Sequence, residues 1–231
     1  MSLRSVKPPH ETRTRILDAA EELFMQHGFE STSMRLLTAK AGANLAAVNY
    51  HFGSKDALIE AVFRRRLDPM NSGRIAELDR LEKEAAGRPG SPPLSPEAII
   101  RAFVGASLRM IEDSKSGGRN FIWLLGRIYT DPQKHICSLI GQLYAPAMER
   151  FKNAFERALP QMPRDELVWR IHFMFGTLAY TLAATDTVQL IAGCKPEDRY
   201  DARLLEARLT AFLAAGLLAP LHDAGDVKKA A

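Results

Sequence analysis

Residues 14–63 combine a helical repeat of apolar side chains with closely spaced glycines, and this combination narrows the possible folds most. The first apolar face predicts a helix that ends at Gly28, because glycine readily adopts the backbone conformation that closes a helix. Gly42 ends a second helix only two residues before Asn44, which can cap a third helix over residues 45–51. Three helices within about forty residues, two of them joined by a tight glycine turn, predict a helix-turn-helix.

Capping residues and inward faces support this assignment. Ser33 or Thr32 can cap the second helix, and Ser54 can cap a fourth that begins directly after Gly53. The side chains expected to face inward are Ile16, Ala20, Leu23, Phe24, Met34, Leu37, Ala41, Val48, Phe52, Leu58 and Val62.

The third helix begins with small or apolar residues and ends with hydrogen-bonding ones. A helix in the DNA major groove brings its backbone close to base edges, so Ala46 and Ala47 suit its N-terminus and can meet a thymine methyl. Leu45 is expected to be too exposed in this helix to belong to the core, which makes it a candidate for an apolar contact with a base. Asn49 lies one turn further on and can bind adenine through both atoms of its amide.

The residues that follow suit the phosphate backbone. Tyr50 and His51 supply hydrogen-bond donors. Lys55 stands at the first position of the fourth helix, where a positive charge opposes the helix dipole unless a phosphate is bound there as well. The alternative is that Tyr50 and Phe52 belong to the core and Lys55 is only solvated.

Composition limits the class of protein. The chain has 231 residues, 46% of them hydrophobic and 25% charged, which suits one large or two small globular domains. Three of its four net positive charges fall within residues 1–67, a modest bias toward a polyanionic partner. The N-terminus does not resemble a signal peptide, so we expect a cytoplasmic protein with free thiols at Cys137 and Cys194. The most apolar segment, residues 171–192, includes polar residues and indicates a buried helix, so we expect no membrane partner.

The segment "TRILDAAEELFMQHGFESTSMRLLTAKAGANLAAVNYHFGSKDALIEAVF", residues 14–63, resembles the DNA-binding domain of TetR-family transcriptional regulators, with "AG", "YHF" and "SK.AL" at matching spacings. The resemblance implies an all-α fold in which residues 45–51 form the recognition helix. In that family the positions of Thr32, Ser33, Tyr50, His51 and Lys55 commonly contact phosphates. The complete set of expected contacts to double-stranded operator DNA is Thr32, Ser33, Asn44, Leu45, Ala46, Ala47, Asn49, Tyr50, His51 and Lys55.

Two residues depart from the family pattern. Asn49 stands where an aromatic residue is usual, and Leu45 stands where a polar or charged one is frequent. The operator sequences of better-known members are therefore not transferable to this chain.

The rest of the chain predicts further helices. Pro69 and Gly73 are expected to interrupt the fourth helix, which resumes as "RIAELDRLEKEAA". Ser95 is expected to cap a helix with Pro96 at its first position, and the pair Asp131-Pro132 and Pro163 mark similar starts. We divide the chain into a helix-turn-helix domain (1–54), a connecting helix (55–86), a loop (87–96) and an all-helical effector-binding and dimerisation domain (97–231).

An effector pocket is expected in that last domain. "VWRIHFMFGTLAYTLAATD" is rich in aromatic residues, and Pro146 should kink a neighbouring helix, so the two could enclose an apolar cavity or be ordinary core. TetR-type C-terminal domains usually bind a small effector, which favours a cavity. "LAAVNYHFGSK", "LGRIYTDP" and "YAPAMERF" further resemble the PsrA-type, fatty-acid-responsive branch, which implies a long-chain acyl effector whose polar end meets Arg119, Arg127 or His172. The expected pocket residues are Phe103, Ser107, Arg119, Trp123, Tyr144, Met148, Trp169, His172, Phe173 and Gly176.

A homodimer is also expected. The apolar stripe in residues 204–218 and the small residues near 176–184 resemble the four-helix dimer interface of the TetR family. One short recognition helix contacts only a few base pairs, so a dimer that binds two half-sites would also be more sequence-specific. The expected interface residues are Ala183, Leu205, Leu209, Phe212, Leu213 and Gly216.

The pattern of an enzyme is missing from the sequence, which has no nucleophile elbow, zinc motif or phosphate loop. We therefore expect no catalytic residues, metal or cofactor. The prediction is a dimeric transcriptional repressor released from DNA by a small apolar effector such as a long-chain fatty acid or acyl-CoA. Two alternatives remain open: an architectural DNA-binding protein without an effector, and a helical lipid-modifying enzyme in which His172 is the one candidate for acid–base chemistry.

Overall fold

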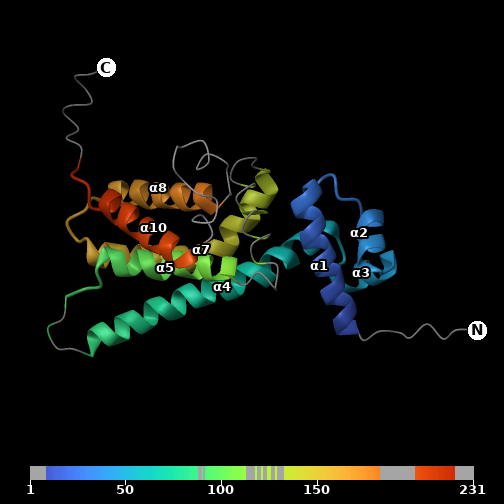
Figure 1. Ribbon diagram of the computed structural model, residues 1–231, viewed down its shortest axis with the longest axis horizontal. Helices are drawn as coiled ribbons and strands as arrows, with labels where there is room; N and C mark the ends of the chain where they lie inside the picture. The colour runs from blue at the N-terminus through green and yellow to red at the C-terminus, as the bar shows by residue number, and fades with distance from the viewer. Residues whose placement is uncertain are drawn as a thin grey trace, which may run out of the picture.

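The computed structural model describes residues 9–87, 90, 92–112, 118, 121, 124, 125, 128, 133–182 and 201–221, and its regular structure there is entirely α-helical. In Figure 1, α1 to α3 form a lobe at one end and α5, α7, α8 and α10 pack together at the other, while α4 leaves the first lobe and runs along the second. The helices are α1 (Pro9–His27), α2 (Met34–Ala41), α3 (Leu45–Phe52), α4 (Lys55–Ala86), α5 (Pro96–Glu112), α7 (Lys134–Ala158), α8 (Arg164–Leu182) and α10 (Ala202–Leu217). The predicted all-α class is confirmed.

The expected caps position the short helices of the N-terminal lobe. Ser33 Oγ, Asn44 Oδ1 and Ser54 Oγ each accept a hydrogen bond from the backbone N–H three residues later, at 3.2, 2.8 and 3.1 Å. Gly42 ends α2 at φ 57° and Gly53 ends α3 at φ 77°, a region that favours glycine. Local sequence therefore sets where α2, α3 and the start of α4 lie.

The expected break at Pro69 and Gly73 is wrong, because α4 runs unbroken from Lys55 to Ala86. Pro69 is exposed, whereas its neighbours Leu67 and Met70 are buried. Packing of the buried side of α4 outweighs the hydrogen bond that proline removes from the exposed side.

The hydrophobic core crosses the expected domain boundary at residue 54. One cluster joins α1, α2 and α3 to Leu58, Val62 and Phe63 of α4, and continues to Phe121 and Tyr144. A second cluster joins the distal half of α4 to α5, α7, α8 and α10. A shift of α4 against α5 or α7 therefore acts directly on the packing of the N-terminal lobe. Among the described helices, none combines the length and apolar character needed to cross a membrane.

Candidate functional site

The outward face of α3 carries the residues that the sequence predicts to contact bases. Val48 is 1% exposed and anchors the helix in the core. On the opposite side Leu45 is 52% exposed and Ala46 and Asn49 are also exposed, while Ala47 is half-buried. An exposed apolar side chain at Leu45 beside the exposed amide of Asn49 has the chemistry needed to contact base edges in the major groove.

The residues expected to contact the phosphate backbone differ in their exposure and in their hydrogen-bond partners. Tyr50 is 82% exposed, and its ring meets the half-buried His51 edge-on at 5.1 Å. Lys55 is half-buried at the first position of α4, and its Nζ donates to the carbonyl of Glu30 at 3.4 Å. Asn44 is exposed, with its side-chain oxygen engaged in the α3 cap.

The predicted phosphate contact of Thr32 is wrong. Its side chain was expected to contact phosphate, but the residue is 2% exposed and its hydroxyl donates to the carbonyls of Gly28 and Leu23 at 2.8 and 3.3 Å. The hydroxyl therefore closes the turn between α1 and α2. Ser33, next along the chain, is exposed and caps α2.

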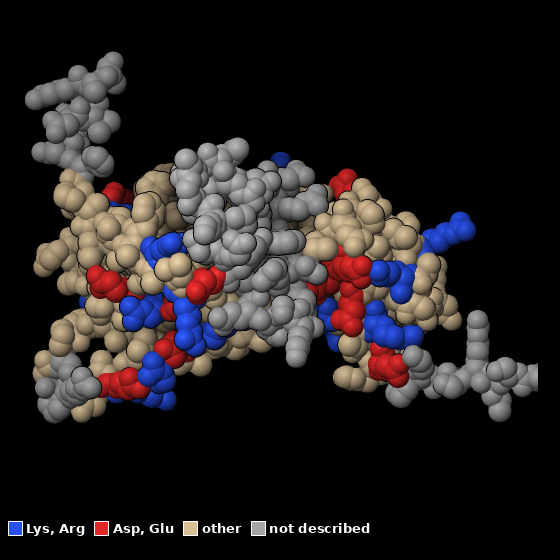
Figure 2. Space-filling model, in the orientation of Figure 1, with Lys and Arg blue, Asp and Glu red and all other residues tan. Residues whose placement is uncertain are grey.

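Arg35 was not among the residues predicted to contact DNA, and its position makes it a further candidate. This residue is exposed in the first turn of α2, two positions after Ser33. A basic residue in the first turn of a helix of the helix-turn-helix was the available signal. Figure 2 shows acidic and basic side chains interspersed over both lobes, without one large basic patch on the face that it shows.

The interior of the C-terminal lobe contains a buried polar group that the sequence did not reveal. Arg74 is 1% exposed and donates to the carbonyl of Phe103 at 3.0 Å, to Asn71 Oδ1 at 3.0 Å and to Ser107 Oγ at 2.6 Å. Its guanidinium lies 3.8 Å from the centre of the Phe103 ring. Asn71 in turn donates to the carbonyl of Leu143 at 3.0 Å. These contacts attach α4 to both α5 and α7.

The expected pocket residues separate into two groups. Phe103, Ser107 and Tyr144 are buried around Arg74, and Met148 is partly buried beside them. Phe175 fills the space next to these residues, with its ring centre 5.0 Å from that of Phe103 and 6.2 Å from that of Tyr144.

The second group lies on the outside of α8, so a single pocket formed by both groups is wrong. Trp169 is 58% and Phe173 61% exposed, and His172 and Gly176 are exposed with them. Gly176 faces outward on α8, so the prediction of an enclosed cavity beside it is also wrong. The buried face of α8 is instead Leu167, Ile171, Met174 and Leu178. Arg119, Arg127 and Trp123 lie outside the described residues, as do Asp131 and Pro132.

Pro146 lies inside α7 and is exposed, as is Gln142, whose carbonyl it frees from the helix ladder. The freed carbonyl therefore belongs to the outer side of α7, and Pro146 does not hold open an inner cavity.

The expected dimer residues on α10 divide in a similar way. Leu209 and Leu213 are buried within the protomer, so their assignment to an outer interface is wrong, and Leu205 is half-buried. Phe212 is 68% exposed and Gly216 is exposed. Ala183 lies outside the described residues.

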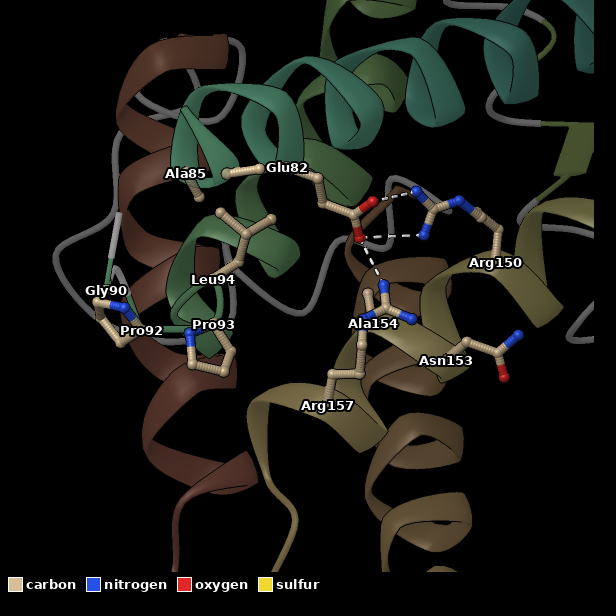
Figure 3. Close-up of a pocket in the computed structure, with 11 residues that line it drawn as sticks. Glu82, Ala85, Gly90, Pro92, Pro93, Leu94, Arg150, Asn153, Ala154 and Arg157 are labelled. Carbon is tan, nitrogen blue, oxygen red and sulfur yellow. Dashed lines mark hydrogen bonds and ion pairs between the residues drawn. The ribbon is translucent and has the colours of Figure 1, made fainter. Parts of the chain in front are cut away.

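A groove of about 910 Å³ lies at the far end of α4, between this helix, the loop residues Gly90, Pro92, Pro93 and Leu94, and α7. Figure 3 shows the Glu82 carboxylate pointing toward Arg150 and Arg157, both of which donate hydrogen bonds to it. These hydrogen bonds, with Arg150 contributing most, lower the pKa of Glu82 below its ordinary value. Because the charged groups of the groove satisfy one another, they offer little with which to orient a ligand.

Two family models match the chain. Residues 16–62 match a model described as bacterial regulatory proteins of the tetR family, and residues 101–216 match one described as the C-terminal domain of tetracycline repressor-like proteins. The second match alone covers half of the chain. The chain belongs to the TetR family. The matching families and relatives are described as transcriptional regulators rather than enzymes.

Curated relatives match this TetR-family chain over short aligned segments. The regulator UidR of Escherichia coli is 45% identical over 51 residues, which are 22% of this chain and 26% of UidR. The repressor AcnR of Corynebacterium glutamicum is 32% identical over 78 residues, which are 34% of this chain and 39% of AcnR. The chain thus spans about a quarter to two fifths of the length of these relatives.

Solved structures share the fold over most of the chain. GusR of Salmonella enterica superposes with a TM-score of 0.61 at 18% identity, over 93% of this chain and 99% of GusR. The fatty acid degradation regulator FadR of Bacillus halodurans gives a TM-score of 0.61 at 13% identity, with the same coverage. At these identities the TetR fold is what they share.

Proposed function

We propose that this TetR-family chain is a homodimeric repressor that binds a two-fold operator through paired α3 helices and leaves it when a small apolar effector binds. The observation that supports this most is the outward face of α3, where Leu45 and Asn49 are exposed above a buried Val48. In the proposal, Leu45, Ala46, Ala47 and Asn49 contact bases. Ser33, Arg35, Asn44, Tyr50, His51 and Lys55 lie along the neighbouring phosphates.

The dimer is proposed to form through the outer faces of α8 and α10. Trp169, Phe173 and Tyr180 of α8 and Phe212 of α10 are each at least half exposed. We take these large apolar side chains, on two helices that contact each other, as the parts of one interface. Gly176 and Gly216 are exposed on these helices, and a Cβ atom at either would meet nothing within 4 Å. This surface suits close packing against the same helices of a second copy.

The effector is proposed to be a long-chain acyl compound, as the resemblance to the PsrA-type branch implies. We place it in the interior beside Phe103, Ser107, Tyr144 and Met148. Phe175 is half-buried among them, so a ligand entering there would displace the Phe175 ring from its contacts with Phe103 and Tyr144. Such a shift would act on the buried group that attaches α4 to α5 and α7.

Operator release tests this proposal. Hexadecanoate, hexadecanoyl-CoA and hexadecanol are titrated into a complex of the protein with labelled operator. We expect the acid or the thioester to release the DNA and the alcohol to be much weaker. Coupling between effector and operator should be about 1–3 kcal/mol in each direction. Operator affinity that no acyl compound changes would favour the architectural alternative, and hydrolysis of the thioester would favour the enzyme.

A further inference from the structure

Three consecutive arginines lie on α4 between the part that completes the N-terminal core and the part that contacts α5 and α7. Arg64 is exposed and pairs with Glu60 on its own helix at 2.7 Å. Arg65 and Arg66 turn toward α1, where both reach the carboxylate of Glu21.

Glu21 is 4% exposed, which is unusual for a carboxylate. Arg66 approaches it with two nitrogens: Nε lies 3.2 and 3.1 Å from the two carboxylate oxygens, and Nη2 lies 2.8 Å from Oε1. Arg65 donates to the other oxygen of Glu21 and, through Nη1, to Asp18 Oδ1 at 2.6 Å. Charge-assisted hydrogen bonds of this forked kind fix geometry as well as adding energy, and removing one member leaves a buried charge without its partner.

The Glu21 cluster (Asp18, Glu21, Arg65 and Arg66) connects α1 to α4 close to the point where α4 is bonded to the C-terminal helices. Arg66 lies eight residues before Arg74, about 12 Å along the helix axis. At Arg74 and Asn71, α4 is bonded to α5 and α7. At Arg65 and Arg66 it is bonded to α1, whose core also contains Val48 of the recognition helix. The cluster therefore fixes how α1, and α3 with it, is oriented on α4.

We propose that Glu21 is a positioning residue for operator binding. With Arg65 and Arg66, it sets the angle between α1 and α4 and so the separation of the two recognition helices. The inference rests on the proposed dimer, because separation matters only when two α3 helices must enter the groove at half-sites about 34–36 Å apart. Glu21 itself touches no DNA.

The test compares E21Q with E22Q. Glu22 is the next residue of α1, and its pair with Lys40 at 2.7 Å is solvent-exposed on both sides, so its loss should have little effect. Operator affinity is measured by fluorescence anisotropy. The separation of the two N-terminal lobes, which carry the recognition helices, is measured as the distance between nitroxides at the end of α1, on His27→Cys in a Cys137→Ser, Cys194→Ser background. For E21Q we expect operator Kd to rise about tenfold or more, as lost charge-assisted bonds predict. Its distance distribution should broaden, while E22Q matches wild type.

R66K provides the second variant, because lysine keeps the charge but loses the fork. It should fold even where E21Q does not, and it should show the same broadening with a smaller loss of affinity. Unchanged affinity and unchanged distances in R66K, or in a folded E21Q dimer, would overturn the inference. The slope of affinity against salt should stay at its wild-type value in both variants, because no phosphate contact is removed. If no acyl compound releases the wild-type protein from its operator, the proposed effector is contradicted, but the conclusion about Glu21 is unaffected.

Discussion

Truncating Phe212 should separate the dimer into protomers. Phe212 lies on the outer face of α10 and is 68% exposed in the single chain. An aromatic side chain buries about 150–250 Å² when fully covered, so the proposed interface would remove roughly 130 Å² of its surface from water. At about 25 cal/mol per Å², that burial is worth roughly 3 kcal/mol per protomer. A two-fold interface contains the residue twice.

Only part of this energy appears as affinity, because association has its own entropic cost and alanine retains the Cβ atom. We therefore expect Phe212→Ala to weaken dimerisation by about 3 kcal/mol or more over both copies, a rise in the dimer dissociation constant of roughly a hundredfold or more. Sedimentation equilibrium over a range of protein concentrations measures this constant directly. Operator binding should also become more steeply dependent on protein concentration, because a dimer must form first.

Tyr50→Ala is the matched control. Tyr50 is 82% exposed, so this change removes a similar aromatic surface, but from the DNA-facing lobe. It should weaken operator binding by roughly 0.5–1.5 kcal/mol, as one lost hydrogen bond predicts, and leave dimerisation unchanged. If Phe212→Ala sediments as a wild-type dimer, the two copies meet elsewhere and the assignment of α8 and α10 is wrong.

Three further changes test other parts of the structure. Lys55→Ala should weaken binding to all DNA sequences alike and lower the salt slope by about one unit, and an unchanged slope would show that Lys55 makes no phosphate contact. Arg170→Met removes hydrogen bonds to the carbonyls of Leu217, Ala219 and Pro220 at 2.7, 2.6 and 3.2 Å, so urea denaturation should show a loss of about 2–4 kcal/mol. Equal midpoints and slopes would show that the end of α10 does not depend on Arg170. Hydrogen bonds from Arg150 and Arg157 lower the pKa of Glu82 below its ordinary value of 4.5, so its contribution to stability is complete above that pH and is lost as pH falls through the lowered pKa. Glu82→Gln should therefore reduce stability at pH 7 and converge with wild type in acid, and a constant difference across pH would contradict this assignment.

The helix-turn-helix could be predicted from sequence because its determinants are local. Ser33, Asn44 and Ser54 cap the helices that follow them, and glycines at positive φ close α2 and α3. These contacts span three or four residues, so spacing alone reveals them.

The C-terminal lobe was predicted less well because α8 is apolar on two sides. Trp169 and Phe173 lie on one side, and Ile171 and Met174 on the other. Helical periodicity identifies both sides but does not say which one packs inside the protomer. Buried charges raise a related difficulty: Glu21 and Arg74 occur in helical segments where sequence alone cannot separate a solvated charge from a buried one.

Selection of binding sites from random DNA tests the central claim most directly. For the wild-type dimer we predict a two-fold symmetric consensus bound by an even number of protomers. For Asn49→Ala we predict lost preference at one position of each half-site, with a cost of about 1–3 kcal/mol there. A consensus without two-fold symmetry, together with identical preferences for wild type and Asn49→Ala, would contradict operator recognition by paired α3 helices.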